Sequence, residues 1–157
     1  MTQTFSIREA MACEREALEA LQRRASLSNP GDRAALLANP DAIVLPLEQI
    51  AAGQVFVAER AGVIIGFAAV LKKADGEIEL DGLFVEPTLW REGVGRSLVH
   101  YCAEFAHTNG SAALLVVGNP HAAGFYAPCG FESLGRQKTR FGEGLLMRKM
   151  LTRGEAF

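Results

Sequence analysis

A strand, a short loop and a helix start near the middle of the chain constrain its fold most strongly. The apolar run Leu83–Val85 ends at Glu86 and Pro87, and the loop after it leads to two glycines, Gly93 and Gly95. The residues that follow have the apolar spacing of an amphipathic helix. Because the first amide N–H groups of a helix have no carbonyl partner within it, this arrangement directs bare N–H groups to one point. Such a point suits a phosphate group.

The loop differs from the common nucleotide-binding loops. A dinucleotide fingerprint would place a third glycine at position 98, which is Leu98. The sequence also lacks the Gly-x-x-x-x-Gly-Lys-Ser/Thr pattern of nucleotide P-loops. The alternative interpretation of Gly93-Val94-Gly95 is a helix start whose glycines permit close packing.

Composition indicates an ordinary globular protein. The 157 residues are 49% apolar and 22% charged with a net charge of −2, and this length suits a single domain over residues 1–157. Three separated cysteines, Cys13, Cys102 and Cys129, lack metal-site spacing. We therefore expect no metal, reduced thiols and a cytoplasmic location. No signal peptide is expected, and no apolar run reaches the roughly 20 residues that cross a membrane.

The charge is uneven near the C-terminus. Residues 136–153 contain six basic side chains and one acidic side chain, Glu143. The basic residues are Arg136, Lys138, Arg140, Arg148, Lys149 and Arg153. Such a cluster fits either a nucleic-acid patch or a solvated strand pair, and we expect the strand pair and no nucleic-acid partner.

Hydrophobic periodicity predicts alternating strands and helices. Strands are expected at 4–7, 55–59, 63–71, 77–85, 112–117, 131–134 and 145–151, with a bulge near Gly82. Helices are expected at 9–25, 30–37, 93–108 and 120–126. This order predicts an α/β fold of the α+β type, with a mixed, mostly antiparallel sheet of about seven strands flanked by about four helices.

Two motifs together resemble one enzyme family. The first runs from Glu79 to Pro87 and on through Trp90–Arg96, and the second runs from Asn119 to Phe131. They resemble the strand with the Gln/Arg-x-x-Gly-x-Gly/Ala loop, and the Asn-x-x-Ala-x-x-Phe-Tyr-x-x-x-Gly-Phe segment, of the GNAT superfamily of N-acetyltransferases. That family transfers an acetyl group from acetyl-CoA to an amine. One position departs from its pattern, because Trp90 stands where the family has Gln or Arg.

The resemblance implies a GNAT-like sheet and acetyl-CoA as co-substrate. The pyrophosphate would bind the loop residues Arg91, Glu92, Gly93, Val94, Gly95, Arg96 and Ser97. The pantetheine arm would bond the main chain of Leu83, Phe84 and Val85 like an added strand, which a bulge near Gly82 would favour by splaying the strand. Asn119 would bond the arm from its other side, and Arg91 or Arg96 would replace the side-chain contact missing at Trp90.

The same resemblance assigns catalytic roles. Glu79 matches the general base that takes a proton from the amine, while the alternatives are a solvated or ion-paired carboxylate, or Asp81 or Glu86 as the base. Tyr126 matches the acid that protonates the coenzyme thiolate, and its alternative is a packed tyrosine. An N–H near Val85 would stabilise the oxyanion. The remaining candidates, His121 and Cys129, are expected to be a surface side chain and a buried thiol.

The sequence therefore predicts an N-acetyltransferase that moves an acetyl group to a primary amine of a small molecule or peptide by direct attack in a ternary complex. The alternative is a non-catalytic acyl-CoA-binding sensor or partner module. Acceptor contacts are expected around residues 20–40 and 136–144, where Arg23, Arg24, Ser26, Arg33, Arg136 and Arg140 lie. These arginines fit either an acidic acceptor or solvated charge. A homodimer through the late strands is compatible with the pattern.

Overall fold

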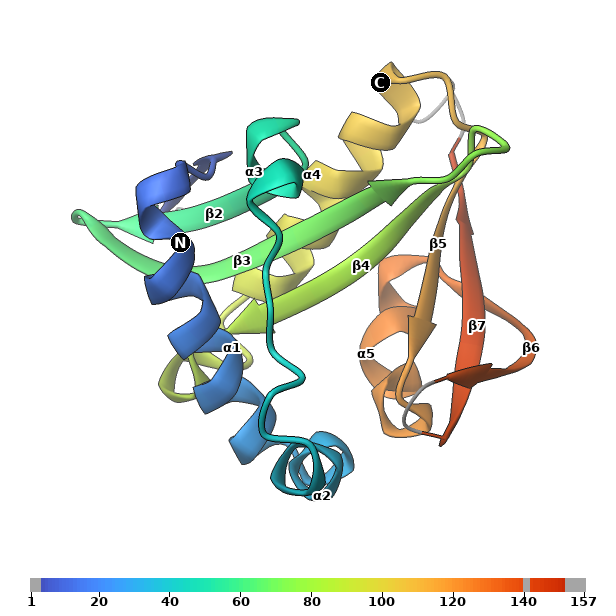
Figure 1. Ribbon diagram of the computed structural model, residues 1–157. Helices are drawn as coiled ribbons and strands as arrows, with labels where there is room; N and C mark the ends of the chain where they lie inside the picture. The colour runs from blue at the N-terminus through green and yellow to red at the C-terminus, as the bar shows by residue number, and fades with distance from the viewer. Residues whose placement is uncertain (1–3, 140–141, 152–157) are drawn as a thin grey trace. The chain divides into compact units, whose positions relative to one another are not determined.

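The computed structural model describes residues 4–139 and 142–151, with only the main chain described at position 121. Within these ranges seven strands form one sheet in the order β1-β2-β3-β4-β5-β7-β6 (Figure 1). The strands are β1 (Ser6–Glu9), β2 (Val55–Arg60), β3 (Val63–Lys72), β4 (Ile78–Val85), β5 (Ala113–Gly118), β6 (Glu132–Thr139) and β7 (Gly142–Met150). The α-helices are α1 (Arg15–Ser28), α2 (Pro30–Ala38), α3 (Leu47–Ala51), α4 (Val94–Thr108) and α5 (Ala123–Tyr126).

The predicted fold class is confirmed. β4 pairs with β5 in parallel, while β1–β2, β2–β3, β5–β7 and β6–β7 are antiparallel. The described residues form five α-helices, one more than the four that the sequence pattern located. The additional helix, α3, has only five residues, so it is too short to show a helical period in the sequence. The expected bulge near Gly82 stays a prediction.

Contacts divide the chain into two compact units, which are described in turn. The first comprises the chain up to Ala69 together with Gly82–Leu98, and the second comprises Val70–Asp81 together with the chain from Val99 onward. β3, β4 and α4 each contribute residues to both units.

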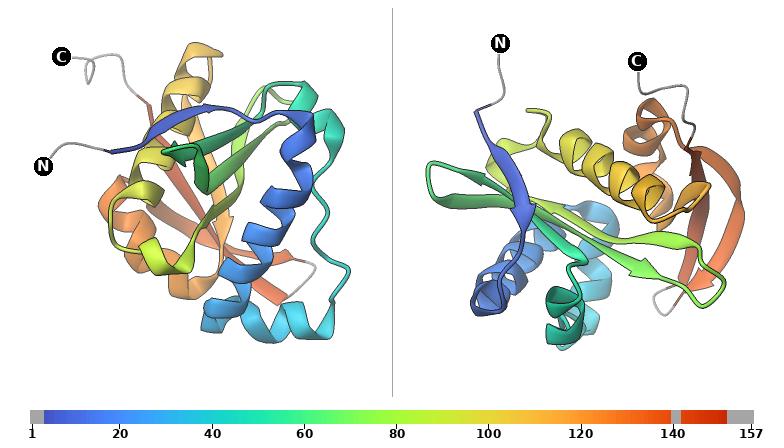
Figure 2. Two further views of the ribbon diagram at one scale, coloured as in Figure 1. Left: turned by 90° about the vertical axis from the view of Figure 1, so that its left-hand side faces the viewer. Right: turned by 90° about the horizontal axis from the view of Figure 1, so that it is seen from above.

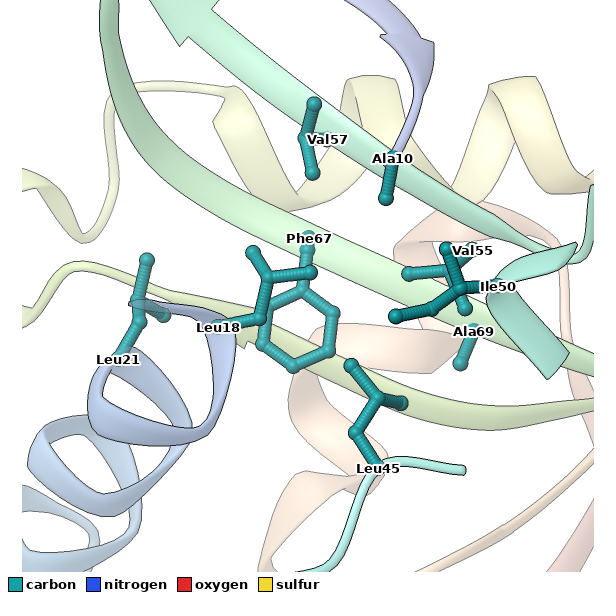
Figure 3. Packing of buried hydrophobic residues seen from close by; sticks show 9 residues of the cluster. All are labelled: Ala10, Leu18, Leu21, Leu45, Ile50, Val55, Val57, Phe67 and Ala69. Carbon is teal, nitrogen blue, oxygen red and sulfur yellow. The ribbon is translucent and has the colours of Figure 1, made fainter. Parts of the chain in front are cut away.

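In the first unit, one apolar cluster fixes α1 and α3 on the same face of β2 and β3 (Figures 2 and 3). The fully buried Leu18 and Leu21 lie three residues apart on α1 and therefore share one side of the helix. They join Ala10, Leu45, Ile50, Val55, Val57, Phe67 and Ala69. Burial of each large side chain contributes about 1.5–3 kcal/mol, so this cluster is a major source of the unit's stability.

On the opposite face of β3, a glycine brings the start of α4 close to the sheet. A Cβ added at Gly66 would lie 3.2 Å from Val94 and 3.3 Å from Leu98. Both of these side chains are buried. Gly66 therefore lets α4 begin directly against the sheet, and this contact fixes where the loop before α4 ends.

In the second unit, β5 is the central strand and β7 lies between β5 and β6 (Figure 1). β7 pairs with β5 from Ala113 opposite Met150 to Gly118 opposite Leu145. Every residue of β6 is exposed. Cys102 of α4 is fully buried, and this burial raises the pKa of its thiol to about 12. Cys102 therefore belongs to the packing and is not a reactive thiol.

Candidate functional site

The loop between β4 and α4 adopts the conformation needed to gather amide groups. A 3-10 turn at Pro87–Leu89 follows β4. Two loop residues then have left-handed backbones, Arg91 with φ 71° and Gly93 with φ 91°. A left-handed residue between ordinary ones turns successive N–H groups toward a common point, as in anion-binding nests. The loop predicted from the glycine pair therefore has a shape suited to a phosphate.

The start of α4 adds further donors. The Ser97 N–H donates to the Gly93 carbonyl at 3.0 Å, which closes the first turn. The N–H groups of Val94, Gly95 and Arg96 lie in the first turn, where the helix has no carbonyl to accept them. Of the predicted loop residues, Ser97 thus has its amide engaged within the helix, and the amides without a helical carbonyl partner are those before it.

The side chains of the predicted phosphate loop mostly point to solvent. Arg91, Glu92 and Arg96 are exposed, and Glu92 lies 4.0 Å from Arg60. By contrast, Val94 is 2% exposed and packs on the sheet. The loop therefore offers main-chain groups to a ligand, while its buried side chain fixes the helix.

The end of β4 presents main-chain groups on the edge away from β3. The Glu86 N–H donates to the Ile65 carbonyl at 2.9 Å, so this N–H group points toward β3. Because main-chain groups alternate in direction along a strand, the N–H and carbonyl groups of Val85 and Leu83 point away from β3. The main-chain carbonyl of Phe84 points toward β3 again, since a Cβ on Gly66 would lie 3.1 Å from the Phe84 carbonyl oxygen. Within the predicted segment Leu83–Val85, an added strand would thus find partners on Leu83 and Val85.

Phe84 supports the strand with its side chain. Its ring centroid lies 5.3 Å from that of Phe67, and a Cβ at Gly82 would lie 2.9 Å from the ring. Gly82 therefore makes room for this ring, a role that the sequence pattern did not suggest.

Glu79, the predicted base, lies on β4 in the second unit. It is in register with Leu115 of β5, and its side chain is 20% exposed. Lys73 donates a hydrogen bond of 3.1 Å to the carboxylate, and this bond raises the pKa of Lys73. The structure thus shows the ion pair that was one alternative for Glu79. A paired carboxylate still has lone pairs that can accept a proton.

The two other carboxylates considered as a base lie in different surroundings. Asp81 is exposed on β4. Glu86 accepts two hydrogen bonds from Arg24 of α1, at 3.1 Å and 2.8 Å. This two-pronged pair raises the pKa of Arg24, chiefly through the side-chain hydrogen bonds to Glu86.

Asn119 and Tyr126 lie in the second unit, next to the end of β5. Asn119 directly follows β5, and its carbonyl accepts the Ala122 N–H at 2.8 Å. Tyr126 is 8% exposed, and a Cβ at Gly118 would lie 3.4 Å from its ring. The rings of Phe125 and Phe131 pack edge-on against it at 5.0 Å and 5.3 Å. The segment therefore fixes the tyrosine ring by packing.

Most other candidate side chains have structural partners. Arg23 and Arg33 donate to the Pro40 and Leu27 carbonyls. In the late hairpin, Arg136 pairs with Glu143 and Arg148 with Glu132, at 3.3 Å and 2.7 Å. These contacts fit the interpretation as structural and solvated charge.

The structure describes the surroundings of some of the remaining candidates and not of others. Lys149 donates to the Cys129 carbonyl at 2.8 Å, and Cys129, expected to be a buried thiol, is half-buried. Ser26 is buried on α1. Arg140 and the side chain of His121 lie outside the described residues.

Sequence reasoning missed one residue of this region. Trp90 was identified only as a departure from the loop pattern, but its indole Nε1 donates a hydrogen bond of 2.8 Å to the Val85 carbonyl. The available signal was that the only tryptophan of the chain stands at the first position of the loop motif.

Neither a metal site nor a membrane-spanning helix is found in the described residues. In residues 4–139 and 142–151, no three His, Cys, Asp or Glu side chains are grouped so that they could hold a metal ion. None of the helices in the described part of the chain is both long enough and apolar enough to cross a membrane.

Comparison with protein families and solved structures gives a consistent result. Residues 16–131 match the model of the acetyltransferase (GNAT) family. A GCN5-related N-acetyltransferase of Rhodopseudomonas palustris is 22% identical, with a TM-score of 0.78 over 96% of this chain and 98% of that one. The PaiA N-acetyltransferase of Thermoplasma acidophilum, solved with coenzyme A, is 16% identical, with a TM-score of 0.74 over 94% and 99%.

A third solved structure was crystallised with the acetylated coenzyme. YncA of Salmonella typhimurium, solved with its cofactor acetyl-CoA, is 19% identical, with a TM-score of 0.71 over 96% of both chains. A search of curated protein sequences finds no significant match.

Proposed function

Since the chain belongs to the acetyltransferase (GNAT) family, we propose that it is an acetyl-CoA-dependent N-acetyltransferase acting on a primary amine. The acceptor is a small molecule or a peptide, and the amine attacks the thioester directly while both substrates are bound. The observation that carries this proposal is the loop after β4, where Arg91 and Gly93 have left-handed backbones directly before the free amides of α4.

The first unit supplies groups for the coenzyme. The amides from Arg91 to Arg96 would hold the pyrophosphate, helped by the positive end of the α4 dipole. The outward main-chain groups of Leu83 and Val85 would bond the amides of the pantetheine arm as an added strand does. The Val85 carbonyl, which already accepts the Trp90 indole N–H at 2.8 Å, would use its second lone pair. These contacts use main-chain atoms, so Trp90 in place of Gln or Arg is compatible with binding.

The chemistry requires two proton transfers. The amine nitrogen attacks the thioester carbonyl carbon, the carbon–sulfur bond breaks, and the sulfur leaves as a thiolate. An alkylamine has a pKa of about 10.4, so a base must remove its proton near neutral pH. In our proposal Glu79 accepts this proton, directly or through water, and the Tyr126 hydroxyl protonates the thiolate, whose own pKa is about 8.5.

One observation supports each role. Glu79 lies on the strand whose end carries the proposed oxyanion donor, the Val85 N–H. Tyr126 is held by Phe125 and Phe131, which limits the motion of its ring. Asn119, next to Tyr126 in the motif and in the second unit, is proposed to bond the pantetheine arm.

The alternative function is a non-catalytic sensor or partner module for acyl-CoA. Such a protein needs the loop and Asn119 but has no use for a base or an acid. The presence of both Glu79 and Tyr126 favours the enzyme.

Calorimetric titration with acetyl-CoA followed by a turnover screen tests both functions. The screen covers amino acids, polyamines, aminoglycosides and peptide N-termini, with release of the free thiol as readout. We expect binding in the micromolar range and turnover with at least one class. Failure to bind at millimolar acetyl-CoA would contradict both functions, whereas binding without turnover of any class would favour the sensor.

The cytoplasmic location and the homodimer also remain predictions. Cys13, Cys102 and Cys129 form no disulfide with one another in the structure, which is compatible with a reducing compartment. For the homodimer, the exposed strand β6 is the surface proposed to pair, and sedimentation at several protein concentrations tests it.

A further inference from the structure

The single tryptophan of the chain lies in the proposed coenzyme loop but has no assigned role. Trp90 is 40% exposed and follows the 3-10 turn Pro87–Leu89. Its own N–H donates to the Pro87 carbonyl at 3.3 Å, which closes the turn. The turn brings the indole back toward the strand, where Nε1 donates to the Val85 carbonyl at 2.8 Å.

This hydrogen bond completes a clamp on one peptide group. The carbonyl of the Val85–Glu86 peptide accepts the Trp90 indole N–H, and the N–H of the same peptide donates to the Ile65 carbonyl at 2.9 Å. A peptide group is planar, so two partners on opposite sides fix its orientation. The clamp therefore sets the direction in which the last residue of β4 presents its own groups.

The clamp lies directly before the strained part of the loop. Arg91 is a non-glycine residue with φ 71°, and such a conformation persists only where its surroundings enforce it. On one side of Arg91 the Trp90 side chain is tied to β4, and on the other side the buried Val94 anchors α4 on the sheet. The three residues between these anchors are thereby held at both ends.

We propose that Trp90 is a positioning residue, whose indole N–H ties the coenzyme loop to the end of β4 and holds the loop amides and the Val85 main chain ready for acetyl-CoA. This inference rests on the proposed function. It replaces the expected direct contact of a Gln or Arg side chain with phosphate by an indirect role, because the indole N–H is directed at the protein's own carbonyl.

The indole N–H itself provides the first test, and it needs no mutation. Because Trp90 is the only tryptophan, a nitrogen-15-labelled sample of the full chain gives one indole N–H signal. We expect its hydrogen exchange to be at least about tenfold slower than that of free tryptophan, as expected of a hydrogen-bonded donor. Coenzyme A should shift this signal. Exchange at the rate of free tryptophan would overturn the proposal.

Three variants separate the hydrogen bond from the ring. Trp90→Phe keeps an aromatic ring without the donor, Trp90→Gln restores a donor, and Trp90→Leu removes both features. We expect Trp90→Phe and Trp90→Leu to weaken coenzyme A binding by roughly five- to tenfold, the effect of one lost neutral hydrogen bond. Trp90→Gln should lie within about twofold of the wild type.

The kinetic pattern distinguishes positioning from general stability. The KM for acetyl-CoA should rise in Trp90→Phe by the same factor as the dissociation constant, while the KM for the amine stays unchanged. Retention of affinity by Trp90→Phe together with its loss in Trp90→Leu would show a ring contact and overturn the proposal. The proposal would also be overturned if all three variants bound coenzyme A with the affinity of the wild type.

The outcome also separates this inference from the proposed function. If wild-type protein fails to bind coenzyme A, the function is wrong, and the proposal that depends on it falls even if the indole N–H is protected. If the wild type binds and turns over while Trp90→Phe behaves identically, the function stands and the positioning role is wrong.

Discussion

Two regions of the molecule supply the proposed chemistry in different ways. In residues 82–97 of the first unit, the groups offered to a ligand are main-chain amides and carbonyls, and side chains serve to hold that main chain in place. Trp90 binds the Val85 carbonyl and Arg24 binds the carboxylate of Glu86. In residues 113–131 of the second unit, the groups offered are side chains, Asn119 and Tyr126, and the main chain and neighbouring rings hold them.

The two regions should therefore tolerate different amino-acid substitutions. A main-chain site depends on backbone conformation, so we expect the identity of an exposed side chain such as Arg96 to matter little there. A side-chain site depends on one atom, such as the Tyr126 hydroxyl, and loses its function when that atom is removed even if the packing is kept. The following predictions test this contrast, in order of expected effect.

Removal of the Tyr126 hydroxyl should give the largest effect. Tyr126→Phe keeps the edge-on packing against Phe125 and Phe131, so we expect little change in the free energy of unfolding or in acetyl-CoA affinity. The turnover number should fall by roughly 10²- to 10⁴-fold, which is the usual contribution of a positioned acid. Steady-state kinetics and calorimetry measure the two quantities.

The chain's other tyrosine supplies the control for this change. Tyr101→Phe also removes one phenol hydroxyl but lies on α4 outside the proposed site residues, and its turnover number should be nearly that of the wild type. An unchanged turnover number in Tyr126→Phe at both neutral and high pH would contradict the acid role.

Replacement of Glu79 should have the second largest effect. Glu79→Gln removes the proposed proton acceptor, and we expect the turnover number to fall by about 10- to 100-fold, since water can carry part of the transfer. The sign of the pH dependence follows from the role. A base must be unprotonated, so the wild-type rate should rise with pH along its acidic limb, and this limb should shift or vanish in the variant.

Asp81→Asn is the matched control on the same strand. It removes a carboxylate two residues away that is exposed. Its rate profile should resemble that of the wild type. If Asp81→Asn rather than Glu79→Gln alters the acidic limb, the base has been assigned to the wrong residue of β4.

The fold and the loop could be read from the sequence because they depend on local patterns. The alternation of the buried Ile78 and Leu80 in β4 and the spacing of Leu18 and Leu21 in α1 reflect the periods of 2.0 and 3.6 residues that burial on one face requires. The glycine pair at 93 and 95 likewise marks a helix start. Helix α3 was missed because five residues do not span two helical turns.

The partners of individual side chains could not be read in the same way. The Lys73–Glu79 pair bridges a turn, and the Arg24–Glu86 pair joins residues 62 positions apart. The contact of Trp90 with Val85 depends on the direction in which the 3-10 turn returns the chain. These contacts follow from the folded geometry, and the sequence holds no period that encodes them.

A main-chain site should respond to backbone strain, which gives the third prediction. Gly93 has φ 91° and nothing within 4 Å of an added Cβ, so Gly93→Ala adds strain without a clash. We expect it to weaken coenzyme A binding roughly tenfold, the equivalent of the 1–2 kcal/mol cost of a left-handed alanine. Calorimetry measures the affinity, and urea unfolding measures the stability.

Gly110 at the end of α4 offers a close match, with φ 84° and equally open space around an added Cβ. Gly110→Ala should lose similar stability, about 1–2 kcal/mol, and keep its coenzyme affinity. Equal affinity in both variants would mean that the backbone of the loop does not determine binding.

The smallest expected effect comes from the side chain of a loop residue. Arg91→Gly relieves the left-handed strain at φ 71°, and we expect it to raise the free energy of unfolding by about 1 kcal/mol. Arg91→Ala removes the same charge but keeps the strain, so it should leave stability nearly unchanged. Both variants should keep coenzyme affinity within about threefold, because an exposed charge contributes little. A loss of tenfold or more in both would show that the guanidinium itself binds phosphate, and the contrast between a main-chain region and a side-chain region would then not hold for this loop.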